Sequence, residues 1–173
     1  MLKLKIELVH PNAKIPVKAT SKAACWDVFA ADIIEQSANF YIVDLGFKLQ
    51  PPPGYKVVLV PRSSITGTYL IQQNSPGQGD EDYRGTYQYR FRIIPSGIMD
   101  IPKENWGIII HEPVTGKLIE PFPITTLQYT SFPYNIGDRI GQIYLEKVHE
   151  FDLEECKLDE TIRGEGGFGS TGK

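Results

Sequence analysis

The stretch FYIVDLGFKLQPPPGYKVVLV, residues 40–60, places two β-forming runs on either side of a proline- and glycine-rich turn. The runs at 40–49 and 55–60 are rich in aromatic and β-branched residues, which favour strands, and the prolines between them prevent a continuous helix. The same arrangement recurs along the chain. Similar runs lie at 2–9, 86–94, 106–112, 117–122 and 139–148.

The composition also favours strands over helices. The 173 residues include 13 prolines, and no apolar stripe continues at the helical period of 3.6. Residues 19–25 and the stretch after Ser63 can hold a helical turn or two, but both are too short for a crossover between parallel strands. Residues 111–120 are expected to form a hairpin. The sequence therefore predicts one all-β domain.

Charge and cysteine content restrict the partners and the compartment. A net charge of −3 and a pI of about 5.6 do not provide the basic surface that nucleic acid requires. No apolar stretch reaches membrane-spanning length. Cys25 and Cys156 lack metal-ligand spacing, and we expect both thiols to be reduced. We predict a cytoplasmic protein that binds neither nucleic acid nor membrane.

The C-terminal stretch RGEGGFGSTGK, residues 163–173, has a composition that suits a nucleotide. Glycines allow backbone N–H groups to approach an anion, Arg163 can bind phosphate oxygens, and Phe168 offers a face for stacking on a base. Ordering such a segment costs about 1–2 kcal/mol per residue, so we expect a mobile lid. The alternative is a flexible, solubilising terminus.

Four other features suggest a phosphate-binding enzyme, although each has a structural alternative. Residues 61–64, PRSS, place donors at a strand end, where they can equally form a cap or an ion pair. Residues 79–85, GDEDYRG, could supply a general base or form a solvated turn. Asp27 stands among apolar residues, so it is either hydrogen-bonded or near a cation. Gln142 could be a routine polar contact.

Taken together, these stretches resemble in order and spacing the five motifs of the homotrimeric dUTP diphosphatases (dUTPases). The resemblance runs through AACWDVFAAD, PRSS, NSPGQGDEDYRG, GDRIGQIYLEKV and the C-terminal stretch. It implies a distorted jelly-roll-like β-barrel over residues 1–173, with an inserted hairpin segment at about 95–131 and a mobile C-terminal arm. It also implies a homotrimer whose sites are shared between subunits.

The resemblance implies roles for individual residues. Asp80 would activate the water that attacks the α-phosphate of dUTP, releasing pyrophosphate and the dUMP used for thymidylate synthesis. Asp27 would contact Mg²⁺ through water. Tyr83 would pack beneath the deoxyribose, and Phe168 would stack on the base. Asn74 would read the uracil edge, with backbone groups of residues 77–80 forming the rest of the hairpin. The implied substrate-binding positions are Arg62, Ser63, Ser64, Asn74, Gly77, Gln78, Gly79, Tyr83, Gln142, Arg163, Phe168, Gly169 and Ser170.

The chain departs from the family pattern at several positions. Cys25 stands where glycine is usual, position 78 is Gln, and Gly79 replaces a β-branched residue, which would loosen the strand before Asp80. The segment at about 95–131 is extra. It could pack on a neighbouring subunit or dock a partner protein, or it could be surface decoration.

Two other functions remain open at this point. The dCTP deaminases share the fold and the Arg-Ser-Ser element, but Gly67 and Arg90 occupy the places of their deamination residues. A nucleotide-gated regulatory module, with a partner protein at the insertion and vestigial hydrolysis, is an alternative of a different class. The intact Asp80, Tyr83 and C-terminal stretch favour catalysis.

Overall fold

The computed structural model describes residues 2–37, 39–94 and 131–166, in which strands form three antiparallel sheets. A two-stranded sheet pairs β1 with β5, and the four-stranded sheets have the orders β2-β10-β6-β8 and β3-β4-β9-β7. The all-β prediction is confirmed. The elements are β1 (Lys5–Leu8), β2 (Trp26–Phe29), β3 (Asp32–Ser37), β4 (Phe40–Asp44), β5 (Phe47–Gln50), β6 (Tyr55–Pro61), the 3₁₀-helix η1 (Ser63–Gly67), β7 (Leu70–Gln72), β8 (Gly77–Gly79), β9 (Gln88–Ile93) and β10 (Arg139–Lys147).

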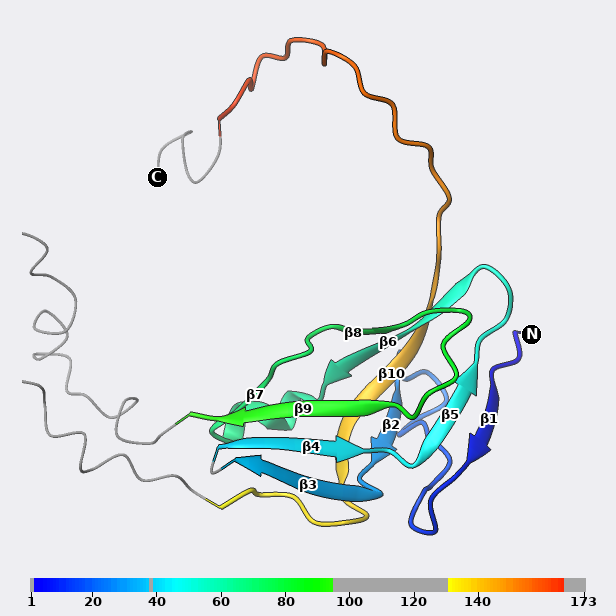
Figure 1. The fold of residues 1–173 in the computed structure, drawn as a ribbon, viewed down its shortest axis with the longest axis vertical. Helices are drawn as coiled ribbons and strands as arrows, with labels where there is room; N and C mark the ends of the chain where they lie inside the picture. Colours follow the sequence, from blue (N-terminus) through cyan, green and yellow to red (C-terminus); the bar gives the residue numbers. More distant parts are fainter. Residues whose placement is uncertain (1, 38, 95–130, 167–173) are drawn as a thin grey trace, which may run out of the picture.

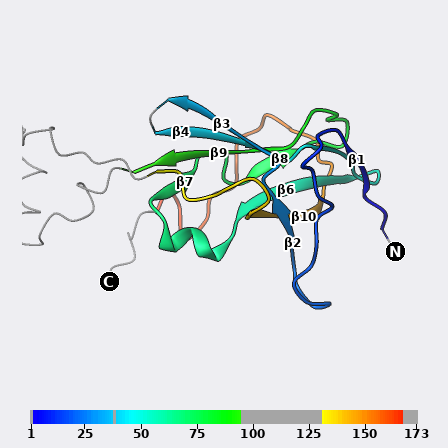
Figure 2. The same cartoon turned by 90° about the horizontal axis from the view of Figure 1, so that it is seen from below.

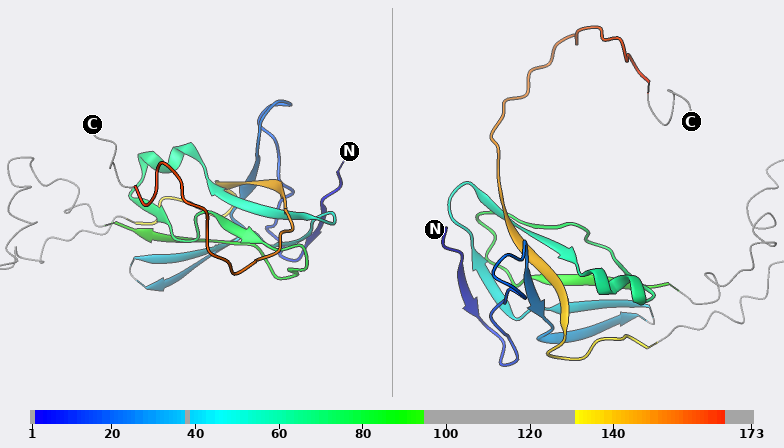
Figure 3. Two further views of the ribbon diagram at one scale, coloured as in Figure 1. Left: turned by 90° about the horizontal axis from the view of Figure 1, so that it is seen from above. Right: turned by 180° about the vertical axis from the view of Figure 1, so that it is seen from behind.

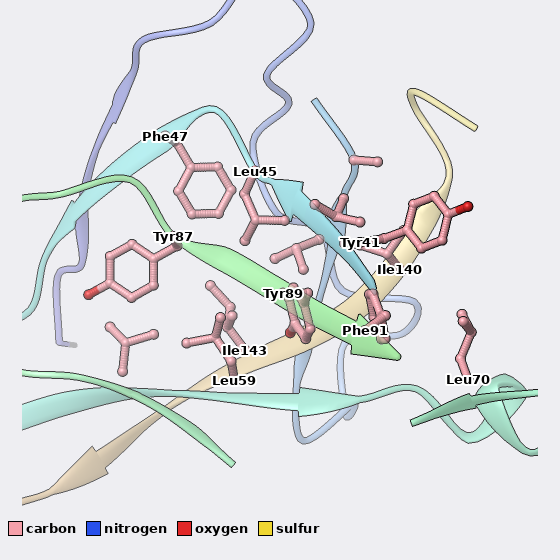
Figure 4. Close-up of a cluster of buried hydrophobic side chains, with 14 of the residues drawn as sticks. Tyr41, Leu45, Phe47, Leu59, Leu70, Tyr87, Tyr89, Phe91, Ile140 and Ile143 are labelled. Atoms are coloured by element: carbon pink, nitrogen blue, oxygen red, sulfur yellow. The ribbon is translucent and has the colours of Figure 1, made fainter. Parts of the chain in front are cut away.

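The core lies between the two four-stranded sheets (Figures 1 and 2). In β9 the side chains alternate, so Tyr89, Phe91 and Ile93 are buried while Arg90 and Arg92 are exposed. Because the side chains alternate with a period of two residues, one face of the sheet points toward the core. Figure 4 shows this inner face meeting residues of β6 and β10, which together form a single hydrophobic cluster.

The stretch at residues 40–60 forms three strands. Residues 40–49 divide into β4 and β5 at Gly46, whose φ of 68° suits glycine and passes the chain from one sheet to another. Residues 55–60 form most of β6. The strands β2, β3 and β7 were not predicted, and the runs at 106–122 lie outside the described residues.

One of the two suggested helical segments is confirmed. The 3₁₀-helix η1 follows Arg62 and packs beside β7. The suggestion for residues 19–25 is wrong because this segment forms turns and bends. The Val17 and Asp27 backbones exchange N–H···O bonds of 2.7 and 3.1 Å, which close the segment into a loop before β2.

After β10 the chain leaves the barrel as an extended arm (Figures 1 and 3). The Val148 N–H still donates to the Gly54 carbonyl at 2.9 Å, and residues 149–165 are exposed. The inserted segment at about 95–131 lies outside the described residues except for Ser131, as do residues 167–173. Among the residues that the structure covers, no helix is long and apolar enough to cross a membrane.

Candidate functional site

Three predicted site residues meet at one end of the β2-β10-β6 sheet. Gln142 of β10 pairs with Asp27 of β2 on one side and with Val60 of β6 on the other. Arg62 follows directly after β6. Because the three strands are neighbours, residues distant in sequence become adjacent, and the polar cluster requires no long loop to assemble it.

The Asp27 carboxylate is the centre of this cluster. Its Oδ1 accepts a hydrogen bond of 2.9 Å from Gln142 Nε2 and lies 3.5 Å from Arg62 Nε. Its Oδ2 lies 3.4 Å from Arg139 Nη1. Only 3% of Asp27 is exposed, so these contacts replace its hydration. The sequence expectation that Asp27 is hydrogen-bonded or near a cation is met in both respects.

Arg62 is held at two points and leads into a turn with exposed hydroxyls. Its Nη1 donates to the Arg139 carbonyl at 3.1 Å, in addition to the contact between its Nε and Asp27. Ser63 and Ser64 begin η1 and are both exposed. A guanidinium, an amide and two hydroxyls at one strand end form a donor set that suits phosphate oxygens.

A second group of predicted residues surrounds the turn after β8. Asp80 is exposed, and its carbonyl accepts from the Tyr83 N–H at 3.2 Å. The Tyr83 hydroxyl donates to the Thr86 carbonyl at 3.0 Å, and its ring lies over Gly85, where a Cβ would overlap it. The ring is therefore fixed close to Asp80 while 43% of the residue stays exposed.

Tyr87 occupies the space beside Gly79. A Cβ built on Gly79 would overlap the Tyr87 ring, although the Gly79 backbone is outside the left-handed region. The ring also meets Tyr83 edge-on, with centroids 5.4 Å apart. Burial raises the pKa of Tyr87 to about 12. The Tyr87 ring therefore packs against β8 just before Asp80. This packing offsets the loosening of the strand that was expected from Gly79.

The expected hairpin at 74–80 is not a two-stranded ladder. β7 pairs with β9, whereas β8 pairs with β6, so residues 73–76 cross between sheets. The Asn74 side chain braces this crossing: its Nδ2 donates to the Gln88 carbonyl and its Oδ1 accepts from the Arg90 N–H, both at 3.0 Å. Asn74 is thus engaged with β9, and the exposed Gln78 side chain accepts from Lys56 at 2.9 Å.

The two groups of site residues lie far apart within one chain. Gly79 pairs with Val57, so Asp80 stands level with Lys56, near the start of β6. Arg62 follows the end of the same strand. At about 3.3 Å per residue, the path between these two levels spans roughly 20 Å. One chain therefore does not bring Asp80 to the Arg62 cluster.

The C-terminal residues form a third, separate group. Arg163 is exposed on the extended arm, and its Nε donates to the Gly166 carbonyl at 2.9 Å. Figure 3 shows this part of the arm well away from the barrel. The predicted lid residues Phe168, Gly169 and Ser170 lie outside the described residues.

The residues present do not fit a protein-held Mg²⁺. Among residues 2–37, 39–94 and 131–166, no group of three or more His, Cys, Asp or Glu side chains could hold a metal ion. Asp27, the predicted contact to Mg²⁺ through water, accepts one hydrogen bond from Gln142 and lies near two arginines, which leaves acceptor positions on its oxygens for a water. The water-mediated contact stays a prediction.

Two residues of these groups were not among the sequence-derived candidates. Arg139 contacts Asp27 and also places its guanidinium 5.9 Å from the Phe29 ring centroid. Tyr87 supports Gly79 and Tyr83. Arg139 lies within the GDRIGQ motif, so a charged residue at the start of an apolar strand was the available signal. No sequence signal marked Tyr87 as a site residue, because its alternation with Tyr89 indicates only a core position.

Whole-chain relatives were found among curated proteins, although no family model matches. The deoxyuridine 5′-triphosphate nucleotidohydrolase of Helicobacter pylori strain J99 is 30% identical over 174 residues, which cover 99% of this chain and 97% of that protein. The protein of that name from Wolinella succinogenes is also 30% identical and is covered over 95% of its length. Both alignments span nearly all of this chain, including most of residues 95–131.

Solved structures with the same fold come from staphylococcal phages. The dUTPase of Staphylococcus bacteriophage 80alpha, solved with dUpNHpp, aligns with a TM-score of 0.68 at 18% identity and covers 99% of each chain. A phage phi11 dUTPase mutant, described with a structural Mg(II) ion, aligns with a TM-score of 0.61 at 16% identity, over 92% of this chain and 99% of that one. These likenesses establish the jelly-roll-like β fold. The identity to the bacterial relatives over nearly the full length then shows that the chain belongs to the dUTPase family of nucleotide hydrolases.

Proposed function

We propose that the protein is a cytoplasmic dUTP diphosphatase that converts dUTP and water into dUMP and pyrophosphate. The whole-chain identity to the Helicobacter pylori enzyme carries this proposal. An exposed carboxylate, Asp80, beside a fixed aromatic ring, Tyr83, adds support from the geometry of the β8 turn. The reaction would lower the dUTP pool and supply dUMP for thymidylate synthesis.

The reaction requires one general base and no covalent intermediate. Asp80 takes a proton from a water whose oxygen forms the new bond to the α-phosphorus, while the bond from that phosphorus to the α,β-bridging oxygen breaks. Pyrophosphate carries away the electron pair of the broken bond. A positioned general base of this kind is typically worth about 10²–10⁴ in rate.

We propose that Mg²⁺ enters as part of the substrate, chelated by the triphosphate of dUTP. There it neutralises phosphate charge and fixes one conformer of the chain. Arg62, Ser63, Ser64 and Gln142 supply protein donors to the phosphates, and Arg163 adds a cation from the arm. Base selection rests on the backbone of residues 77–79, because a wrong pyrimidine edge would leave polar groups unpaired.

We further propose a homotrimer in which one subunit's Asp80 faces another subunit's Arg62 cluster, with the arm of a third subunit closing the site through Arg163, Phe168, Gly169 and Ser170. The separation of roughly 20 Å along β6 supports this, since a single chain would leave the site incomplete.

Apolar surface on each chain also supports assembly. The arm exposes 77–111% of Phe151, Leu153, Leu158 and Ile162, which is unusual for apolar side chains in a monomer. A groove of about 660 Å³ beside β1, lined by Leu4, Trp26 and Leu145 among others, offers apolar surface that a second copy could cover.

The experiment is a comparison of pyrophosphate release from dUTP, dCTP, dTTP and UTP in Mg²⁺ buffer. We expect turnover of dUTP alone at low substrate concentration. Ammonia release from dCTP would instead identify a deaminase, and binding of dUTP without pyrophosphate release would favour a regulatory module. Either outcome would reject the proposed reaction.

The matched variant is Asp80→Asn, which keeps the size of the side chain and removes the base. Because Asp80 is exposed, we expect an unchanged melting temperature and retained nucleotide binding. We expect kcat to fall at least ~100-fold. Turnover equal to that of the wild type would exclude Asp80 as the base.

A further inference from the structure

Tyr87 is a buried aromatic residue whose backbone is fixed at two points. Only 3% of the residue is exposed. Its N–H donates to the Phe47 carbonyl at 3.2 Å, and its carbonyl accepts from the Leu45 N–H at 2.9 Å. The Phe47 ring packs near the Tyr87 ring, with centroids 6.3 Å apart (Figure 4). These contacts leave the Tyr87 ring little freedom to move.

The outer end of this ring reaches both sides of the turn that carries Asp80. The hydroxyl end fills the volume that a Cβ on Gly79 would need. The same ring meets Tyr83 edge-on, at an interplanar angle of 79° and a centroid distance of 5.4 Å. One core side chain therefore supports the residue before Asp80 and the aromatic ring that follows it.

The Tyr83 ring has two further restraints, and both come from its own turn. Its hydroxyl donates to the Thr86 carbonyl at 3.0 Å, and its ring lies over Gly85. These contacts hold the ring through residues at most three positions away, whose backbone can shift together with it. Tyr87 is instead tied to Leu45 and Phe47 on other parts of the barrel. Its edge contact is the one that fixes Tyr83 relative to the core.

We propose that Tyr87 is a positioning residue that determines the discrimination between dUTP and UTP, because it prevents the Tyr83 ring from moving away from the sugar. This inference rests on the proposed function, with Tyr83 beneath the deoxyribose as the family resemblance implies. The two nucleotides differ by one hydroxyl group at the 2′ position. A ring that cannot retreat rejects this group by overlap, whereas a ring with free space behind it accommodates the group.

Gly79 makes this role of Tyr87 specific to the chain. A β-branched residue is usual at position 79 in the family, and its side chain would fill the space behind the turn from β8. Here the Tyr87 ring fills that space from the opposite side. Support for the turn therefore depends on Tyr87.

The experiment compares kcat/KM for dUTP with kcat/KM for UTP in the wild type and in Tyr87→Leu. Leucine removes the ring and leaves a cavity into which Tyr83 can move. We expect the ratio of the two kcat/KM values to fall at least ~10-fold. The same active molecules turn over both substrates, so this ratio does not depend on how much of the enzyme is folded. A loss of stability alone leaves it unchanged.

Phe91→Leu is the matched control for the loss of a buried ring. Phe91 lies further along β9 and packs near Phe132 and Tyr134. Its replacement should lower stability by a similar amount and change the dUTP to UTP ratio less than about twofold. An equal fall in both leucine variants would make the effect one of general core packing and would overturn the proposal.

Two further variants show how Tyr87 acts. Tyr87→Phe keeps the ring and should keep the discrimination; its loss there would overturn the proposal even if Tyr87→Leu does not fold. In a Tyr83→Ala background, Tyr87→Leu should change the ratio less than about twofold, because Tyr87 acts through Tyr83. A full additional fall in that background would contradict this route.

Exchange of volume provides a rescue. In Gly79→Val combined with Tyr87→Leu, the valine refills part of the space behind the turn. The dUTP to UTP ratio should recover at least about threefold relative to Tyr87→Leu. No recovery in a folded double variant would exclude the volume of the ring as the cause.

Binding separates this inference from the proposed reaction. Equilibrium binding of the non-hydrolysable α,β-imido analogues of dUTP and UTP reports sugar preference without turnover. A wild type that prefers the deoxy analogue but releases no pyrophosphate from dUTP would reject the reaction, while loss of that preference in Tyr87→Leu would still support the role of Tyr87. A preference that stays unchanged in folded Tyr87→Leu would overturn it.

Discussion

At the scale of single residues, the most informative pair is Gly79 and Tyr87. The tyrosine ring fills the volume that a side chain at position 79 would need, directly before the proposed base. The two positions are therefore complementary in size, and neither can be changed freely alone. The position of Asp80 therefore depends on the contact between Gly79 and Tyr87, which the sequence around either residue does not reveal.

This complementarity can be measured by a double-mutant cycle. Gly79→Val should overpack the site and lower the free energy of unfolding by about 1–3 kcal/mol, and Tyr87→Leu alone should leave a cavity with a loss of similar size. The double variant should recover at least about 0.5 kcal/mol relative to the sum of the singles. Urea denaturation gives all three values, and strict additivity would contradict the contact.

Tyr87 also predicts a response to alkaline pH. Below pH 10 the phenol is neutral in both the folded and the unfolded protein, so it adds no pH dependence. Between pH 10 and about 12 the unfolded chain loses this proton and the folded chain keeps it, since burial raises the pKa of Tyr87 to about 12. The free energy of unfolding should then fall by up to about 1.4 kcal/mol per pH unit from this group.

Tyr87→Phe should remove that slope. Its hydroxyl is buried without a hydrogen-bond partner among the described residues, so its loss should not reduce stability at pH 7. Burial also raises the pKa of Tyr89, and part of the alkaline slope should therefore remain in the variant. Parallel pH profiles of the wild type and Tyr87→Phe would contradict the assignment.

At the scale of secondary structure, β10 is the element that assembles the polar cluster around Asp27. It pairs with both β2 and β6, and a register irregularity between Arg139 and Gly141 precedes Gln142. The Tyr89 ring lies against Gly141, and its hydroxyl donates to the Gln142 carbonyl at 2.8 Å. The packing of Tyr89 from β9 thus fixes the position of Gln142 within β10.

Gly141→Ala should disturb this element. An added Cβ would overlap the Tyr89 ring, which is fully buried, and we expect a loss of about 1–3 kcal/mol in the free energy of unfolding. Gly67→Ala is the matched control because nothing lies within 4 Å of its added Cβ. Equal melting temperatures for the two variants would show that the strand can shift without cost.

The sequence predicted strands well where side chains alternate between buried and exposed. It predicted them poorly where a strand is defined by pairing with residues distant in the sequence. The run at 86–94 shows period two and contains β9, and the run at 40–49 contains its partner β4. β7 is too short to show a period, and the crossing at 73–76 depends on which strands it joins. The two arginine partners of Asp27 could not be predicted, because three separate strands bring them together.

At the scale of the whole molecule, the site is divided among parts of the chain that do not meet. The register of β6 separates Asp80 from Arg62, and the arm that includes Arg163 leads away from the barrel (Figure 1). The motif resemblance implies sites shared between subunits but not which residues are separated within one chain. The antiparallel pairing of β6 with β8 supports the proposed sharing, because it separates Asp80 from Arg62.

Mixing two inactive variants tests this division. Asp80→Asn and Arg62→Ala should each be inactive, but a mixture that is unfolded and refolded together should regain about a quarter of wild-type activity, if subunits assemble at random and neighbours supply the two residues. Light scattering should report a trimer for each variant. No recovery from a mixed trimer, or an active monomer, would place both residues in one chain's site.

The apolar side chains exposed on the arm should make the stability of this protein depend on its concentration. Side chains such as Leu153 and Ile162 cannot remain in water without a cost in free energy of about 25 cal/mol per Å² of apolar surface. If the proposed trimer forms, a lone chain would be both catalytically incomplete and prone to aggregate. Thermal stability should rise with protein concentration, so that folding, assembly and solubility form one linked equilibrium.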